Sequence, residues 1–330
     1  MKQTNISVFI PHNGCKNTCS FCNQRTISGH SEQITPDALC ELLKEQQPHL
    51  LKTDRQAQIA FFGGSFTAID REYMCSLLEV AQQFVKDYPT QFVGIRCSTR
   101  PDCIDKDVLT ILKDYGMTAI ELGAQSMSDE VLCANRRGHT AEDVRLAAGL
   151  IKSFGFELGL QMMTGLYKDT PDRCIYTAEE FIKLSPDTVR IYPTVILKGT
   201  ELDELREKGI YKTFGFDETI DLCAELLEKF RQHNIPVIRM GLHASEDVEN
   251  NMTGGVYHPA LREIVESRLF LKEMLSVTDE GGRYIFYTDK SNISKITGQG
   301  GYNRGILQEK NITFKIKEEK GTILRAERIF

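Results

Sequence analysis

Six short apolar segments alternate with longer helix-like segments, and this alternation constrains the fold more than any other feature of the sequence. The apolar segments are rich in Val, Ile, Phe and Leu, as buried strands are. Repeated strand and helix units of this length are typical of a parallel sheet. We expect strands at 5–10, 58–63, 91–97, 117–123, 156–163 and 187–193, and helices at about 35–47, 70–87, 105–115, 140–154, 171–184 and 216–233.

Several of the expected helices begin with a capping signal. Thr35, Thr140 and Thr170 each precede an expected helix, and Pro36 and Pro171 follow two of them. The sequence therefore predicts an α/β fold, a partial barrel of six strand and helix units, with its chemistry on the loops after the strands. A seventh apolar segment, IPVIRMGL at 235–242, fits either a further strand or a return segment.

The pattern changes after the Gly- and Asn-rich stretch ENNMTGG at 249–255. One helix is expected at about 259–275, followed by short strands near 283–288, 312–317 and 322–328. We therefore expect a barrel over residues 1–250 and a small α+β domain or lid over 251–330. Within it, GQGGYNRG at 298–305 fits either a lid over the barrel mouth or a surface turn.

Composition narrows the class of protein. The chain has 330 residues, 41% of them hydrophobic, and no apolar run approaches the length of roughly 20 residues that spans a bilayer. We expect a cytoplasmic protein with no membrane contact.

Ten cysteines in a reducing compartment favour metal or thiol chemistry over disulfides. The net charge of -6 argues against broad, non-specific binding to the phosphate backbone of nucleic acids.

Three of the cysteines, Cys15, Cys19 and Cys22, follow the first expected strand in PHNGCKNTCSFCNQ at 11–24. Cysteine thiolates hold zinc and iron–sulfur clusters. Structural zinc needs a fourth ligand, which would be His12, His30 or a remote cysteine. A four-iron cluster on three cysteines instead leaves one iron open to bind a small molecule.

The Cys-x3-Cys-x2-Cys loop, with Phe21 before its last cysteine, resembles the signature of the radical S-adenosylmethionine (radical SAM) enzymes. The resemblance implies a 4Fe-4S cluster on Cys15, Cys19 and Cys22, with S-adenosylmethionine as cosubstrate on the open iron and Phe21 among the cofactor-binding residues. It also implies reductive cleavage of the cosubstrate to methionine and a 5′-deoxyadenosyl radical.

Gly63 and Gly64 lie at the end of the second expected strand, in FFGGSFT. A backbone without side chains at this point either lets a ligand approach closely or forms a tight turn. The resemblance implies contact with the methionyl amino group of the cosubstrate.

Further segments resemble the catalytic subunit of Elongator and, more distantly, oxygen-independent coproporphyrinogen III oxidase. They are STRPDCID (98–105), IELGAQS (120–126), NRRGHT (135–140), LQMMTGL (160–166) and RIYPTVILKGTEL (190–202). By position, the resemblance implies that Ser98, Gln125, Arg136 and Gln161 line the S-adenosylmethionine pocket. Ser98 and Gln161 stand where these relatives often carry carboxylates.

Other polar residues have two interpretations each. Glu121 either lies near the cosubstrate or pairs with Arg100 or Arg136. Arg190 and Tyr192 alternate with apolar neighbours, so one face of their strand points them into the barrel. His139 is expected in a turn or at the surface. His243 is a candidate substrate contact or an ordinary loop residue, and the seven other cysteines are expected to be small buried hydrophobes.

The main hypothesis is a radical SAM enzyme of unidentified substrate, served by an electron donor of flavodoxin or ferredoxin type. An RNA- or tRNA-modifying radical SAM enzyme is the alternative, supported by the Elongator-like segments and opposed by the charge. A zinc-stabilised binding protein without enzymatic activity is the third hypothesis. About 75 residues follow Gly255, too few for an acetyltransferase domain, so acetyl-CoA-dependent modification is not expected.

Overall fold

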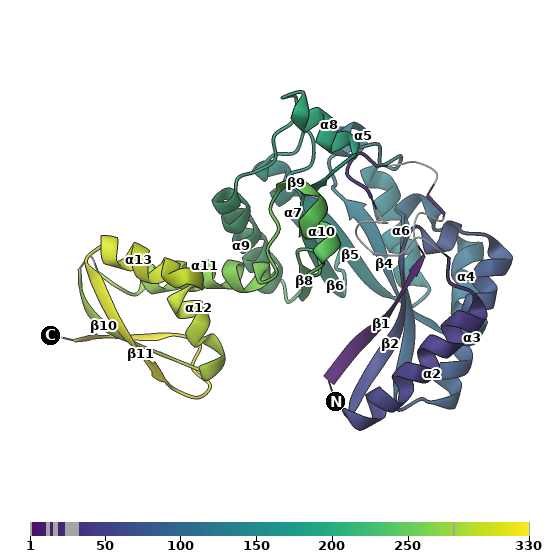
Figure 1. Cartoon of the computed structure of the whole chain (residues 1–330), viewed down its shortest axis with the longest axis horizontal. Helices are drawn as coiled ribbons and strands as arrows, with labels where there is room; N and C mark the ends of the chain where they lie inside the picture. The colour runs from purple at the N-terminus through teal and green to yellow at the C-terminus, as the bar shows by residue number, and fades with distance from the viewer. Residues whose placement is uncertain (1, 11–13, 16–18, 24–32, 280, 330) are drawn as a thin grey trace.

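The computed structural model describes residues 2–10, 14–15, 19–23, 33–279 and 281–329. Within these ranges, seven parallel strands form one curved sheet (Figure 1). Their order in the sheet, β1-β2-β3-β4-β5-β6-β8, follows the chain, as expected of successive strand and helix units. The strands are β1 (Lys2–Ile10), β2 (Arg55–Gly63), β3 (Phe92–Thr99), β4 (Met117–Gln125), β5 (Glu157–Thr164), β6 (Thr188–Pro193) and β8 (Val237–Met240).

Helices cover the outer side of this sheet (Figure 1). They are α2 (Pro36–Lys52), α3 (Arg71–Asp87), α4 (Lys106–Asp114), α6 (Ala141–Ser153), α7 (Pro171–Leu184) and α9 (Phe216–Gln232). The short helix α5 (Asp129–Ala134) lies in the connection between β4 and α6. The expected caps are present, since the hydroxyls of Thr35, Thr140 and Thr170 each accept a hydrogen bond from a backbone N–H in the first turn. Cap and proline signals therefore set the first residue of three helices.

The predicted α/β partial barrel is confirmed, with one strand more than the six expected. The segment 235–242 contains β8, which pairs in parallel with β6 and is not a return segment. Several short elements were not predicted, because each is too short to show a clear periodic pattern. In the barrel part they are α5 (Asp129–Ala134), β7 (Val195–Leu197), α8 (Glu201–Glu207), α10 (Glu246–Asn251) and β9 (Met252–Gly255). In the C-terminal part they are α12 (Ile293–Thr297) and α13 (Tyr302–Glu309). β7 and β9 pair antiparallel.

The main core lies between the sheet and its helices, where Phe61, Phe92, Phe181 and Phe230 are fully buried. This packing holds the carboxyl ends of the strands at one edge of the sheet. No helix in the described ranges combines the length and the apolar character needed to cross a bilayer.

A helix, α11 (Leu261–Ser276), connects this core to the C-terminal part of the chain. Leu261 and Val265 on its first half pack into the main core, and Leu271 and Met274 on its second half pack into a separate cluster. That cluster lies against a three-stranded sheet of order β11-β10-β12. The remaining elements are β10 (Gly282–Thr288), α12 (Ile293–Thr297), α13 (Tyr302–Glu309), β11 (Ile312–Glu318) and β12 (Arg325–Ile329).

The predicted division at residues 250 and 251 falls inside α10 and stays a prediction. The segment 298–305 forms a short 3₁₀ turn and the first half of α13. Figure 1 shows α13 beside the C-terminal sheet, away from the carboxyl ends of the barrel strands. None of its residues lines the barrel cavity described below. The surface-turn interpretation therefore describes this segment better than a lid.

Candidate functional site

A cavity of about 690 Å³ opens at the carboxyl ends of the barrel strands. Parallel strands bring the loops that follow them to one edge, and this is where barrel enzymes carry their chemistry. Of the ten residues that the sequence predicts for the site, nine line this cavity. They are Cys15, Cys19, Phe21, Cys22, Gly63, Gly64, Ser98, Gln125 and Gln161.

The cysteine loop is anchored through Ser20. Its hydroxyl donates to Oδ1 of Asn135 at 2.7 Å, its N–H donates to the Asn135 carbonyl at 3.2 Å, and its own carbonyl accepts from the N–H of Leu202 at 2.9 Å. The amide of Asn135 also donates to the carbonyl oxygens of Val131 and Tyr167. The loop is therefore tied to the chain after α5 and to α8, one of the elements that the sequence did not reveal.

The three thiols suit a soft metal centre. Cys15, Cys19 and Cys22 are free of disulfides and line the same cavity, and three sulfur donors match an iron–sulfur cluster or, with a fourth ligand, zinc. Among the described residues, no three His, Cys, Asp or Glu side chains are gathered closely enough to hold a metal in this arrangement. His12 and His30, considered above as zinc ligands, lie outside the described residues.

The glycine pair closes tightly against the first strand. Gly63 has φ +112°, and a Cβ at this position would lie 2.8 Å from the carbonyl oxygen of Ile10. The N–H of Gly64 donates to the same carbonyl at 2.8 Å. Position 63 therefore accepts only glycine, and the backbone of the pair lines the cavity without side chains.

The amide side chains predicted for the site face each other. Nε2 of Gln161 lies 3.4 Å from Oε1 of Gln125, and Ser98 donates its hydroxyl to Oε1 of Glu121 at 3.2 Å. Gln125 has φ +68° at the end of β4. The three residues lie on adjacent strands and offer neutral donors and acceptors to the cavity.

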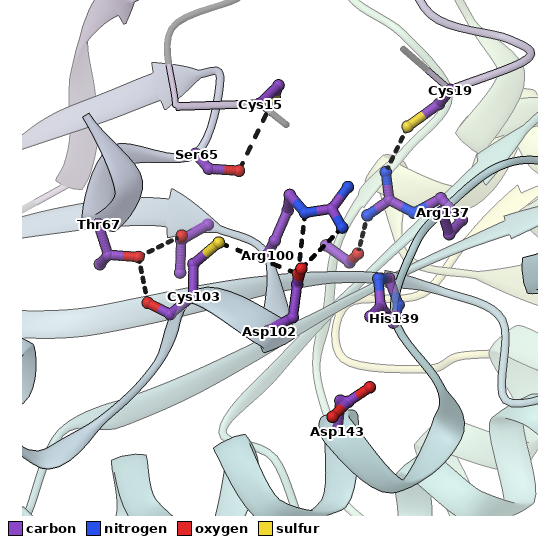
Figure 2. A network of polar contacts seen from close by, with 12 residues as sticks. Cys15, Cys19, Ser65, Thr67, Arg100, Asp102, Cys103, Arg137, His139 and Asp143 are labelled. Carbon is purple, nitrogen blue, oxygen red and sulfur yellow. Dashed lines mark hydrogen bonds and ion pairs between the residues drawn. The ribbon is translucent and has the colours of Figure 1, made fainter. Parts of the chain in front are cut away.

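Arg136 does not line the cavity, and its neighbour Arg137 does. The Arg136 side chain is 65% exposed and pairs with Glu201 at 2.9 Å. Arg137 is buried, and its Nη1 donates to the Sγ of Cys19 at 3.0 Å while its Nη2 donates to the carbonyl of Gly123 (Figure 2). Its guanidinium also lies 5.8 Å from the ring centroid of Phe21. The sequence prediction named the wrong member of this arginine pair for the cavity.

A buried ion pair also lines the cavity. Nε of Arg190 lies 2.6 Å from Oε2 of Glu121, and Nη1 of Arg190 donates to the hydroxyl of Tyr192 at 3.3 Å. The partner of Glu121 is therefore Arg190, and neither Arg100 nor Arg136. Burial raises the pKa of the Tyr192 hydroxyl. The placement of Arg190 and Tyr192 inside the barrel is confirmed.

The two histidines differ from one another. His139 lies in the connection between α5 and α6, which agrees with the expected turn, but it is buried, so the alternative of a surface position is wrong. Its Nε2 lies 3.1 Å from the carbonyl oxygen of Ala124. Burial, followed by the charge of Arg137, lowers the pKa of His139 to about 4. His243 lines the cavity on the loop after β8, and burial followed by Arg239 lowers its pKa. Its contact with substrate stays a prediction.

Of the seven cysteines outside the loop, only some are buried as expected from the sequence. Cys97, Cys174 and Cys223 are buried, which agrees with the expectation. Cys133, on the short helix α5, is exposed and contradicts it. The others, Cys40, Cys75 and Cys103, are half-buried.

Comparisons with known proteins agree with this geometry. A curated relative, Elongator complex protein 3 of Bos taurus, is 28% identical over 244 residues, which cover 68% of this chain and 44% of the relative. The tRNA uridine(34) acetyltransferase of Methanocaldococcus jannaschii is 32% identical over 186 residues, which cover 51% of this chain and 34% of the relative. The chain thus spans less than half the length of these two relatives.

Solved structures share the fold. The archaeal Elp3 of Methanocaldococcus infernus superposes with a TM-score of 0.64 at 20% identity, covering 84% of this chain and 64% of the other. Coproporphyrinogen III oxidase (HemN) of Escherichia coli gives 0.51 at 20% identity, covering 70% of this chain and 53% of the other.

Two family models match the chain. The C-terminal domain model of the radical SAM proteins matches residues 186–270. The model of the Radical SAM superfamily itself matches residues 9–181, just over half of the chain. The chain therefore belongs to the radical SAM superfamily.

Proposed function

We propose that this protein is an enzyme that holds a 4Fe-4S cluster on Cys15, Cys19 and Cys22 and cleaves S-adenosylmethionine reductively to act on a substrate not yet identified. The observation that supports it best is that all three thiols and the glycine pair line one cavity. When bound, the cluster would supply the electron that splits the cosubstrate into methionine and a 5′-deoxyadenosyl radical.

The chain's own residues would bind and orient the cosubstrate. The backbone at Gly63 and Gly64 offers polar groups without side chains, and Ser98, Gln125 and Gln161 offer a hydroxyl and two amides suited to ribose and adenine edges. Arg137 replaces Arg136 in this proposal, because only Arg137 reaches the cavity. The ring of Phe21 lies 5.8 Å from the guanidinium of Arg137 and lines the same cavity.

An apolar wall on the other side of the cavity would exclude water from the reacting atoms. Val195, Leu197, Leu242 and Val248 line it, and the pairing of β7 with β9 holds the first two in place. A radical reacts with groups that lie near it, so an apolar lining limits side reactions. An electron donor of flavodoxin or ferredoxin type, and a cytoplasmic location, belong to the same proposal.

The second candidate is a radical SAM enzyme that modifies RNA. It is favoured by the 32% identity to a relative named as a tRNA uridine(34) acetyltransferase. The net charge of -6 weighs against it.

Metal analysis tests the main proposal against the zinc alternative. Protein reconstituted without oxygen should hold about four irons with an equal amount of sulfide per chain. Cys15→Ala, Cys19→Ala and Cys22→Ala should each lose the cluster. Cys133→Ala, an exposed cysteine away from the cavity, is the matched control and should keep it. One tightly bound zinc and no sulfide would contradict the proposal.

A further inference from the structure

Arg100 is a buried guanidinium held in one orientation. It follows β3 directly, it is 4% exposed, and it lines the cavity. Its Nε and Nη2 donate to the two carboxylate oxygens of Asp102 at 2.9 Å each. Such two-point pairing fixes the plane of a guanidinium. Asp102 therefore sets where the third nitrogen, Nη1, points.

The Nη1 atom of Arg100 is buried and has no hydrogen-bond partner among the described residues. A buried donor without an acceptor costs about 1–3 kcal/mol, and more when it belongs to a charged group. Figure 2 shows this nitrogen on the side of the guanidinium away from Asp102, toward the space between Cys15 and Cys19. Cys15 and Cys19 line the same cavity as Arg100. The Nη1 donor without a partner thus belongs to a side chain that lines the same cavity as the proposed metal ligands.

We propose that Arg100 contacts the iron–sulfur centre of the proposed function, with Nη1 donating a hydrogen bond to an anionic sulfur, either the Cys19 thiolate or an inorganic sulfide. This inference rests on the proposed function. Arg137 contacts Cys19 at 3.0 Å, so two guanidiniums would face one centre. Arg100 differs from Arg137 in that Asp102, and not a backbone carbonyl, orients it.

The contact has a thermodynamic consequence. One-electron reduction, with the electron taken from an external reductant, makes the centre one unit more negative. A hydrogen-bond donor aimed at the sulfur in a water-poor site stabilises the more negative state, although the Asp102 carboxylate offsets part of the positive charge of Arg100. Arg100 therefore raises the midpoint potential of the centre and makes it easier to reduce.

The test is an EPR-monitored redox titration of the reconstituted protein with dithionite and mediators, without S-adenosylmethionine. Arg100→Gln should keep the iron and sulfide content of the wild type and shift the midpoint to a more negative value. Arg100→Lys keeps the charge but loses the fixed geometry, so its midpoint should fall between the two. Arg96→Gln is the matched control, because Arg96 is also buried on β3 but does not line the cavity. Its midpoint should stay closer to the wild type.

An unchanged midpoint in Arg100→Gln overturns the inference, even if the variant then binds S-adenosylmethionine more weakly. That result would assign Nη1 to the carboxylate of the cosubstrate instead. If Arg100→Gln fails to hold a cluster, Arg100→Lys decides: a midpoint equal to that of the wild type would contradict the inference. A wild-type protein that takes up no cluster would instead overturn the proposed function.

Discussion

Arg137 and Cys19 lie 118 residues apart in the sequence and meet at 3.0 Å between Nη1 and Sγ. The same guanidinium donates to the carbonyl of Gly123 on β4, so it connects the cysteine loop to the sheet. Arg136, one residue earlier, has φ +53° and turns its side chain outward to Glu201. Two adjacent arginines therefore have different surroundings.

This difference predicts opposite results for two matched variants. Arg137→Gln removes two hydrogen bonds from a charged, buried group, worth about 1.5–3 kcal/mol each. Formation of 5′-deoxyadenosine should fall by roughly tenfold to a hundredfold. Arg136→Gln removes only a surface pair and should stay within about twofold of the wild type. Equal losses in both variants would show that position 137 has no special contact with the site.

Breaking the ion pair between Glu121 and Arg190 should destabilise the fold. Glu121→Gln leaves the Arg190 guanidinium buried without its counter-charge, which costs about 3–5 kcal/mol. Urea unfolding of the apo-protein measures the loss. Glu41→Gln, which breaks an exposed pair with Lys44, is the control and should change stability by less than about 1 kcal/mol. A loss for Glu121→Gln no larger than that of the control would contradict the buried pairing.

A comparison of the unfolding free energies of Gly63→Ala and Gly116→Ala should separate the effect of steric crowding from that of backbone strain. Both glycines have positive φ, +112° and +76°. A Cβ at Gly116 meets nothing within 4 Å, so its variant should lose only about 1–2 kcal/mol from strain. A Cβ at Gly63 meets the Ile10 carbonyl at 2.8 Å, so that variant should lose about 3 kcal/mol or more. Similar unfolding midpoints for the two would disprove the close approach of β1.

His139 should make the fold sensitive to mild acid. Its pKa is about 4 in the folded protein and about 6.5 in an unfolded chain. Between these values the unfolded chain binds the proton and the folded protein does not, so stability falls as the pH drops from 6.5 toward 4. From pH 7 to pH 5 this residue should account for about 2 kcal/mol.

Chemical unfolding of the apo-protein at the two pH values measures this effect. His139→Gln should lose that part of the pH dependence. His233→Gln, at an exposed position, should retain it. A pH dependence that is the same in His139→Gln and in the wild type would rule out the buried neutral histidine.

The sequence predicted most of the barrel, because its elements carry local signals. Thr35, Thr140 and Thr170 mark helix starts, and apolar runs mark the strands. Segment 235–242 stayed open because four residues of β8 are too few to show a period.

The site was less predictable, because it depends on which way neighbouring residues turn. Nothing in NRRGHT distinguishes Arg136 from Arg137, since the choice depends on one positive φ. The partner of Glu121 depends on strand order, which places β4 and β6 on either side of β5. Arg100 and Asp102 lie two residues apart in STRPDCID, so their ion pair could have been predicted from the sequence. The absence of a hydrogen-bond partner for Nη1 among the described residues could not, because it depends on the surrounding fold.

The central claim is tested most directly by incubating the reconstituted protein with S-adenosylmethionine and dithionite and measuring 5′-deoxyadenosine by chromatography. The wild type should form it, together with methionine, and Cys22→Ala should form none. An iron-loaded wild type that leaves S-adenosylmethionine intact, or a Cys22→Ala variant that cleaves it as well as the wild type, would contradict the account.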